Sequence, residues 1–224
     1  GGQLNISGGE VSFTGTLNFQ GGTGGNDVNE VPDAAAGAGG SVSITGGELK
    51  LLGGAIDLSS GSGATNGAEG SLNIAGGTLS VDASGPNSLD NILVAGQFNF
   101  AAGTLHVTDS DGFTIGASGR IASEIGGSAA RLGPGQNLVI DSLLTIPAGT
   151  SLTLESGVGS ADLTIVSSGA SVTNASGSSL IAGPVVALAG SRIRVDSGIL
   201  SIGDASAVDG FGSAGQMHIG SNSV

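Results

Sequence analysis

The sequence predicts an all-β protein: a right-handed single-stranded parallel β-helix (β-solenoid) of about nine coils, at roughly 22–26 residues per coil, with loop insertions in its N-terminal half. Short segments alternate apolar and other residues with a period of two, the spacing of a strand with one buried face. These segments recur along the chain, as in repeat architectures. Glycine supplies 45 of the 224 residues, but 38% of the residues are hydrophobic, which is enough to form a core and argues against disorder.

Four segments of the N-terminal half align, and each is predicted to form a strand, a corner and a second strand. They are QLNISGGEVSF from Gln3, SVSITGGELKL from Ser41, SLNIAGGTLSV from Ser71 and QFNFAAGTLHV from Gln97. In each segment two apolar residues at i and i+2 precede a corner of small residues, and a second alternating pair begins seven residues after the first. Glycine pairs at the corners of the first three segments allow the chain to bend with φ > 0, where a Cβ atom would clash.

The connections between the aligned segments differ in length, since the first apolar position advances by 38, 30 and then 26 residues. Residues 21–39, 61–69 and 82–90 are rich in small and turn-forming residues and lack sustained alternation. We expect these insertions to project as loops from the outside of the solenoid, where they do not disturb the stack.

The chain divides into two parts of one continuous solenoid. Residues 1–112 contain the glycine corners and the acidic insertions, with 11 acidic residues and 1 basic residue. Residues 113–224 have 7 acidic and 4 basic residues and a closer spacing of short apolar pairs, such as Leu138 with Ile140. This second part is predicted to continue the solenoid with shorter, more regular coils.

Charge and composition exclude several kinds of partner. The formal net charge is −13, whereas nucleic acids and anionic membranes are bound through Lys and Arg. No apolar run approaches the roughly 18 residues of a membrane-spanning helix, so we expect no direct membrane insertion. Cysteine is absent, which removes disulfides, thiolate metal sites and thiol nucleophiles.

Three segments carry a resemblance to a known family: LNIAGGTLSV, FNFAAGTLHV and LTIPAGTSLTLESG. They resemble the autotransporter-associated β-strand repeats of autotransporter passengers and of large bacterial surface proteins, including proteins with a PEP-CTERM sorting tail. The resemblance implies a right-handed parallel β-helix displayed outside a bacterial cell, on its surface or released from it. It implies no catalytic residues, because the family's motif contains none.

Acidic residues in two loops are the candidate metal ligands. Asp27, Glu30 and Asp33 lie within one insertion, and Asp109 and Asp111 form a second short acidic turn. Oxygen-rich flexible loops suit Ca²⁺, although the spacing matches no EF-hand or Gly-rich nonapeptide repeat. The alternative is that both are solvated acidic loops. We therefore expect no required cofactor and name Ca²⁺ as the candidate ion.

The two histidines and one charged stripe offer little chemistry. His106 falls between two apolar strand residues and is expected to point outward, and His218 lies among alternating residues. Arg192, Arg194 and Asp196 alternate with apolar residues and share an outward face. Parallel β-helix polysaccharide lyases use such residues, but a surface charge ladder is the favoured interpretation.

The sequence begins inside one repeat (GGQLNISGG) and ends inside another (GQMHIGSNSV), so we expect an excerpt of a longer repeat protein or a unit that stacks end to end. The predicted function is an extracellular structural module of a bacterial surface fibre, and not an enzyme. The expected partners are further copies or neighbouring repeats of the same protein. The alternatives are an adhesin whose loops bind a cell-surface or matrix ligand and, third, a polysaccharide-active β-helix enzyme.

Overall fold

The computed structural model describes most of the N-terminal half of the chain and short segments of the rest. The described residues are 1–25, 35–82, 92–108, 113–114, 120–121, 130–133, 135–140, 144–146, 152–154, 171–174, 178–181, 185–187, 192–195, 199–202 and 217–219. No helix among them is long and apolar enough to cross a membrane.

Eighteen strands lie within the described residues. They are β1 (Gln3–Phe13), β2 (Leu17–Asn18), β3 (Ser41–Leu52), β4 (Ile56–Asp57), β5 (Ser71–Asp82), β6 (Leu93–Ala95), β7 (Gln97–Val107), β8 (Phe113–Thr114), β9 (Ala130–Leu132), β10 (Gln136–Ile140), β11 (Leu144–Ile146), β12 (Leu152–Leu154), β13 (Ser171–Asn174), β14 (Ser178–Ile181), β15 (Val185–Ala187), β16 (Arg192–Val195), β17 (Ile199–Ile202) and β18 (Met217–Ile219).

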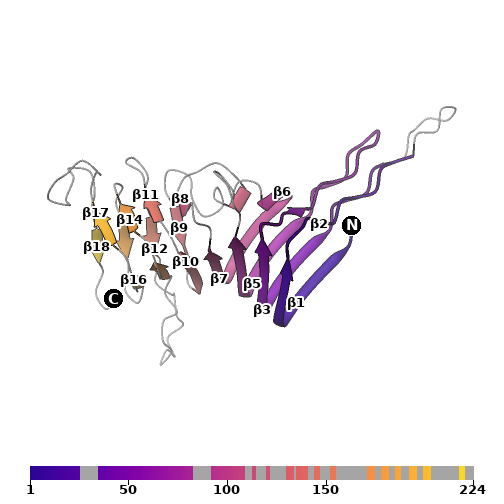
Figure 1. Cartoon of the computed structure of the whole chain (residues 1–224). Helices are drawn as coiled ribbons and strands as arrows, with labels where there is room; N and C mark the ends of the chain where they lie inside the picture. The colour runs from indigo at the N-terminus through magenta and orange to yellow at the C-terminus, as the bar shows by residue number, and fades with distance from the viewer. Residues whose placement is uncertain are drawn as a thin grey trace, which may run out of the picture.

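The strands form parallel sheets that the chain visits in turn (Figure 1). The largest sheet has seven strands in the order β1-β3-β5-β7-β10-β13-β16. The other sheets have the orders β2-β4-β6, β8-β11-β14-β17 and β9-β12-β15-β18. After each strand of the largest sheet the chain passes through one or two of the others and returns one position further along. The expected all-β class is confirmed. The expected nine coils find no support, because the largest sheet contains seven strands within the described residues.

We use the word layer for one strand of the largest sheet with the strands that follow it. The first layer contains β1 and β2, the second β3 and β4, the third β5 and β6, and the fourth begins with β7. The four aligned sequence segments are the first strands of these layers. They pair in parallel with equivalent residues side by side: Gln3 beside Ser41, Ser41 beside Ser71, and Ser71 beside Gln97.

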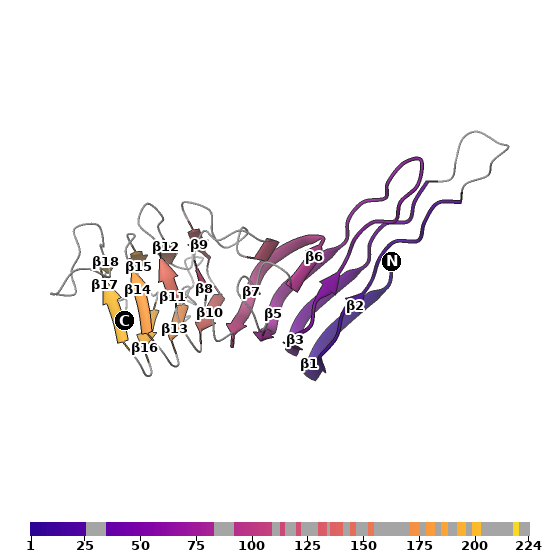
Figure 2. The same cartoon turned by 45° about the horizontal axis from the view of Figure 1, so that its top comes forward.

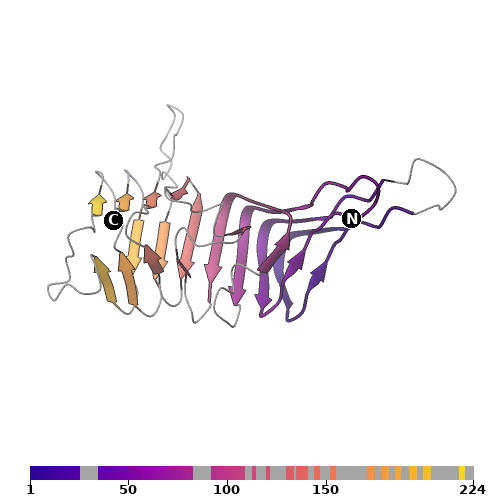
Figure 3. The same ribbon diagram turned by 90° about the horizontal axis from the view of Figure 1, so that it is seen from above.

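The corners of the aligned segments are bends within long strands rather than breaks between two strands. β1 runs without interruption from Gln3 to Phe13, and its pairing with β3 shifts register on both sides of Ser7. Gly9 and Gly47 have φ values of 72° and 69°, which residues with a Cβ rarely adopt. The shift in register is that of a β-bulge, which bends a strand while leaving it paired on both sides. Figure 3 shows the resulting curved strands stacked along the molecule.

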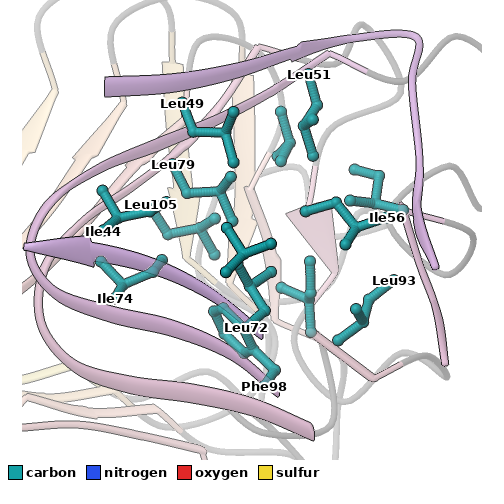
Figure 4. Close-up of a cluster of buried hydrophobic side chains, with 14 of the residues drawn as sticks. Ile44, Leu49, Leu51, Ile56, Leu72, Ile74, Leu79, Leu93, Phe98 and Leu105 are labelled. Carbon is teal, nitrogen blue, oxygen red and sulfur yellow. The ribbon is translucent and has the colours of Figure 1, made fainter. Parts of the chain in front are cut away.

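Aliphatic side chains from successive layers fill the interior of the N-terminal half. Leu49, Leu79 and Leu105 are fully buried at equivalent positions of β3, β5 and β7, and Ile56 and Leu93 face them from β4 and β6 (Figure 4). Burying one such side chain stabilises the fold by about 1.5–3 kcal/mol. The inward alternation predicted from the sequence therefore forms one continuous core.

The phenylalanines of β7 belong to this core. Phe98 and Phe100 are 3% and 7% exposed, and their ring centroids are 6.1 Å apart. Phe98 extends the column of Val42 and Leu72 by one layer. Both aromatic residues are therefore core residues of the fourth layer.

Two of the predicted insertions extend away from the sheets and pair with each other (Figures 1 and 2). We call residues 19–25, 35–40 and 58–70 the glycine arm. Its backbone hydrogen bonds recur every three residues: from the N–H groups of Gly21 and Gly24 to Ser59 and Ser62, from Ala36 and Gly39 to Thr65 and Ala68, and from Gly40 and Gly37 to Phe19 and Gly22, at 2.8–3.0 Å. Three residues per turn is the repeat of polyproline II, a helix without internal hydrogen bonds. The arm therefore consists of extended segments that satisfy one another's backbone groups.

Glycine is required in the arm because the segments touch backbone to backbone. A Cβ atom at Gly61 would overlap Gly22, one at Gly67 would overlap Gly37, and one at Gly70 would overlap Gly40. The same reason places glycine at the crowded axis of packed polyproline II chains in collagen. Close packing of the backbones thus explains why these insertions have a glycine-rich, low-complexity sequence.

Candidate functional site

The candidate calcium ligands lie outside the described residues. Asp27, Glu30 and Asp33 fall within residues 26–34, and Asp109 and Asp111 fall within residues 109–112. In the parts of the chain that the structure describes, no group of three or more His, Cys, Asp or Glu residues could hold a metal ion. Calcium binding by the two acidic loops stays a prediction.

Outward-facing polar side chains of β1, β3, β5 and β7 form a connected group that we call the polar ladder. It consists of Glu10, Glu48, Lys50, Ser80 and His106. The strand register explains its geometry, because Lys50 lies beside Ser80 and Ser80 lies beside His106, while Glu10 lies beside Glu48. The five side chains come from four layers, so the ladder links residues up to 96 positions apart in the sequence.

Lys50 joins the first and second layers. Its Nζ lies 2.7 Å from Glu10 Oε2 and 3.5 Å from Glu48 Oε2. The hydrogen bond from Lys50, a second one from Ser12 and the positive charge of Lys50 together lower the pKa of Glu10 below its usual value. The hydrogen bond to Glu10 raises the pKa of Lys50. Glu10 is exposed and Lys50 is half-buried. Ion pairs this open to solvent contribute little to stability, so this contact orders the surface more than it stabilises the fold.

Ser80 joins the second, third and fourth layers. Its side chain is 5% exposed, and its Oγ donates a hydrogen bond of 2.5 Å to Glu48 Oε1. The same oxygen lies 3.3 Å from His106 Nδ1. Because the single hydroxyl proton points to the carboxylate, we assign Nδ1 as the protonated nitrogen that donates to Ser80.

The order of these three groups differs from that of a catalytic triad. In a Ser-His-Asp triad the imidazole lies between the carboxylate and the hydroxyl, so that it can accept the hydroxyl proton. Here the hydroxyl of Ser80 lies between Glu48 and His106, and its proton is held by the carboxylate. The arrangement connects three layers and does not have the order of a Ser-His-Asp triad.

His106 has the phase that the sequence predicts. Leu105 and Val107 on either side are fully buried, whereas His106 is half-buried. The side chain of His218, in β18, is not among those described. Sequence reasoning missed the rest of the polar ladder, although aligning the outward positions of the repeats places Ser12, Lys50, Ser80 and His106 in one column.

A second polar contact fixes the base of the glycine arm. Arg120 Nη1 lies 2.8 Å from Glu69 Oε2 and donates a 2.7 Å hydrogen bond to the carbonyl oxygen of Gly96. Glu69 also accepts a hydrogen bond of 3.2 Å from the backbone N–H of Gly96. The arm of the second layer is thereby tied to the start of the fourth layer.

Asp57 links the two layers of the arm where they leave the sheets. Gln20 Nε2 donates to Asp57 Oδ2 at 2.6 Å, and the backbone N–H of Ser59 donates to Oδ1 at 2.9 Å. Partial burial raises the pKa of Asp57, but hydrogen bonds from the Ser59 backbone, the Ser59 side chain and Gln20 outweigh it and lower the pKa. The charged form of Asp57 is thus stabilised by neighbours from both layers.

The charged stripe of the C-terminal half lies on a strand. β16 spans Arg192–Val195, and Arg192 and Arg194 pair with Ser171 and Thr173 of β13. Asp196 lies outside the described residues, as do the side chains of the two arginines. The alternation of charged and apolar residues predicted a strand at this position, and β16 is that strand.

Comparisons with known proteins add no relatives. No solved structure and no curated protein matches the chain significantly, and no protein-family model matches it. The resemblance to autotransporter-associated repeats consequently stays a prediction from the sequence motifs.

Proposed function

We propose that this chain is part of a right-handed parallel β-solenoid that serves as a rigid structural module of an extracellular, bacterial surface fibre. The observation that carries the proposal is the registered stacking of four layers. Buried apolar positions lie beside apolar positions through β1, β3, β5 and β7, and outward positions are mostly polar, with the exposed Leu52 beside Asp82 as an exception. A body built in this way gains length by adding equivalent layers, and each layer is stabilised by its neighbours.

The dimensions suit a short, stiff rod. Parallel strands lie about 4.8 Å apart, so the seven strands of the largest sheet span roughly 30 Å at that spacing. Backbone hydrogen bonds run along this direction, and the polar ladder and the glycine arm also connect one layer to the next. Bending such a rod requires breaking several kinds of contact at once.

The surface charge favours an extended assembly over lateral clumping. The net charge is −13, and like charge keeps separate rods apart in solution. The proposed location, on or outside a bacterial cell, is supported by the resemblance of LNIAGGTLSV and FNFAAGTLHV to surface-protein repeats. Partners along the rod would be neighbouring repeats or further copies of the same protein.

Electron microscopy of the native protein tests the structural role. We expect thin unbranched fibres whose length grows with protein concentration or with the number of repeats in the parent chain. Dispersed globular particles at every concentration would count heavily against the proposal. A suitable control is the variant Leu49→Arg, which buries a charge in the core and should abolish fibres along with the fold.

A surface adhesin is the second candidate, and the projecting glycine arm is the observation that favours it (Figure 2). Deleting residues 26–34, between two described segments of the arm, tests this role. Loss of cell or matrix adhesion with fibres retained would assign binding to the arm, and unchanged adhesion would remove this candidate. The matched control deletes residues 83–91, which lie between β5 and β6.

A further inference from the structure

One side of the first layer pairs with no other described layer. The equivalent side of each following layer is covered by the layer before it. β1 is an edge strand of the seven-stranded sheet. Val11 and Phe13 are only half-buried, whereas Leu49 and Leu51, at the equivalent positions of β3, are fully buried. The apolar columns of the core therefore end at β1 on a partly open apolar surface, next to unpaired backbone groups.

Glycines at equivalent positions show how closely the layers approach. In the second layer, a Cβ atom at Gly46 would lie 2.6 Å from the carbonyl oxygen of Ser7, and one at Gly54 would lie 2.5 Å from that of Gly15. A Cβ atom at Gly61 would overlap Gly22. These glycines of the second layer are necessary because the backbone of the first layer lies against them.

The first layer also has glycine at these three positions, although no described backbone lies against them. Gly8 corresponds to Gly46 by alignment of the repeats, although the strand register places Gly46 beside Ser7. Gly15 and Gly22 correspond to Gly54 and Gly61 at the offset by which β2 pairs with β4. A Cβ atom at any of the three would meet nothing within 4 Å, and none of the three has a φ in the left-handed region. Their local conformation and surroundings leave room for a side chain, so nothing among the described residues requires glycine there.

We propose that the open side of the first layer binds a further layer of the same repeat type, with its own strand pairing to β1 and its own glycine segment packing on the arm. This rests on the proposed solenoid and specifies which side of it continues and what the partner must be. The partner is a parallel strand–corner–strand layer whose backbone comes within contact of Gly8, Gly15 and Gly22. Continuity with the interface between the first two layers is the basis for this choice.

The chain supplies a probe for the test. Gly2, Gly40 and Gly70 each directly precede the first residue of a layer's long strand, so a copy of residues 41–69 fused ahead of Gly2 of the full chain places a second-layer sequence over β1. Hydrogen exchange is measured on the extended and the original chain at a concentration where both are monomeric. We expect the β1 amides that point away from β3 to exchange roughly a hundredfold more slowly in the extended chain, and the urea midpoint to rise.

Alanine substitutions separate docking from folding. The triple variant Gly8→Ala, Gly15→Ala, Gly22→Ala should leave the original chain's urea midpoint unchanged and abolish the added protection in the extended chain. The matched variant Gly46→Ala, Gly54→Ala, Gly61→Ala should lower the midpoint of both chains. Unprotected β1 amides in the extended chain, or protection that survives the first triple variant, would overturn the inference.

These results are independent of the proposed fibre. If the native protein forms fibres but the added layer does not protect β1 in the extended chain, only the docking inference is refuted. If the added layer protects β1 and stabilises the extended chain but the native protein forms no fibres, only the mechanical role is refuted.

Discussion

The carbonyl oxygen of Gly22 occupies the place where Gly61 would carry a Cβ atom, so the first and second layers of the glycine arm touch backbone to backbone. The contact is one-sided, because a Cβ atom at Gly22 would meet nothing within 4 Å. The two glycines thus occupy equivalent positions, but we expect a side chain to destabilise the fold at Gly61 and not at Gly22.

Gly61→Ala should destabilise the chain by about 1–3 kcal/mol, the usual cost of overpacking a close contact. Urea unfolding followed by circular dichroism measures the change. Gly22→Ala is the matched control and should stay within about 0.5 kcal/mol of the original chain. Equal effects of the two substitutions would contradict the packing described for the arm.

Leu49→Ala should lower the free energy of unfolding by about 2–5 kcal/mol, because it removes a fully buried side chain and leaves a cavity between layers. Leu52, on the same strand, is 44% exposed, and Leu52→Ala should change stability by about 0.5 kcal/mol or less. The urea midpoints of the two variants measure these changes. A larger loss of stability for Leu52→Ala than for Leu49→Ala would show that the buried face of β3 has been assigned wrongly.

Ser80→Ala should cost about 1–2 kcal/mol, since a buried hydroxyl that donates to the charged Glu48 is lost. Ser12 occupies the equivalent position of the first layer and is exposed. Ser12→Ala should therefore have little effect. A double-mutant cycle with Glu48→Gln measures the coupling between Glu48 and Ser80, and zero coupling would argue against a stabilising role of the polar ladder.

Asp57→Asn should destabilise the chain at neutral pH but not in acid. The pKa of Asp57 is lowered in the folded chain, so its charged form contributes stability above the unfolded pKa. That contribution is lost as the pH falls through the folded pKa. Unfolding free energies measured from pH 7 down to pH 2 should show the gap between the two proteins closing. A gap that stays constant over this range would mean that the carboxylate charge is not the cause.

Removing divalent ions with EDTA should leave the thermal midpoint of unfolding unchanged, because backbone pairing and aliphatic columns hold the described layers together. A midpoint that falls with EDTA and returns with Ca²⁺ would show that calcium stabilises the fold. The variant Asp27→Asn, Glu30→Gln, Asp33→Asn would then locate the ion in the first acidic loop, and Asp109→Asn, Asp111→Asn would serve as the matched comparison.

Local pattern was enough to predict the strands and their phases. The alternation around Leu49 and Leu79, with glycine pairs between the two halves of each segment, predicted buried and exposed faces that the structure confirms. It did not predict that β1 and β3 run through their corners as single bent strands, because a bulge depends on how two strands pair. The sequence reasoning did not use the alignment of the repeats that places Ser80 beside His106, and the hydrogen bond to Glu48 depends on side-chain rotamers that the alignment does not contain.

The sequence by itself determined the all-β class, the repeat, and the side of each strand that faces the core, because a period of two in hydrophobicity is a local property of the chain. Only the tertiary structure decided how the layers contact one another: the packing of the glycine arm, the links of the polar ladder, and the open side of β1 with its three unexplained glycines. The contacts of the arm join residues 12 or more positions apart through backbone groups that every residue has, and the ladder joins side chains of different layers. Neither composition nor periodicity records these contacts.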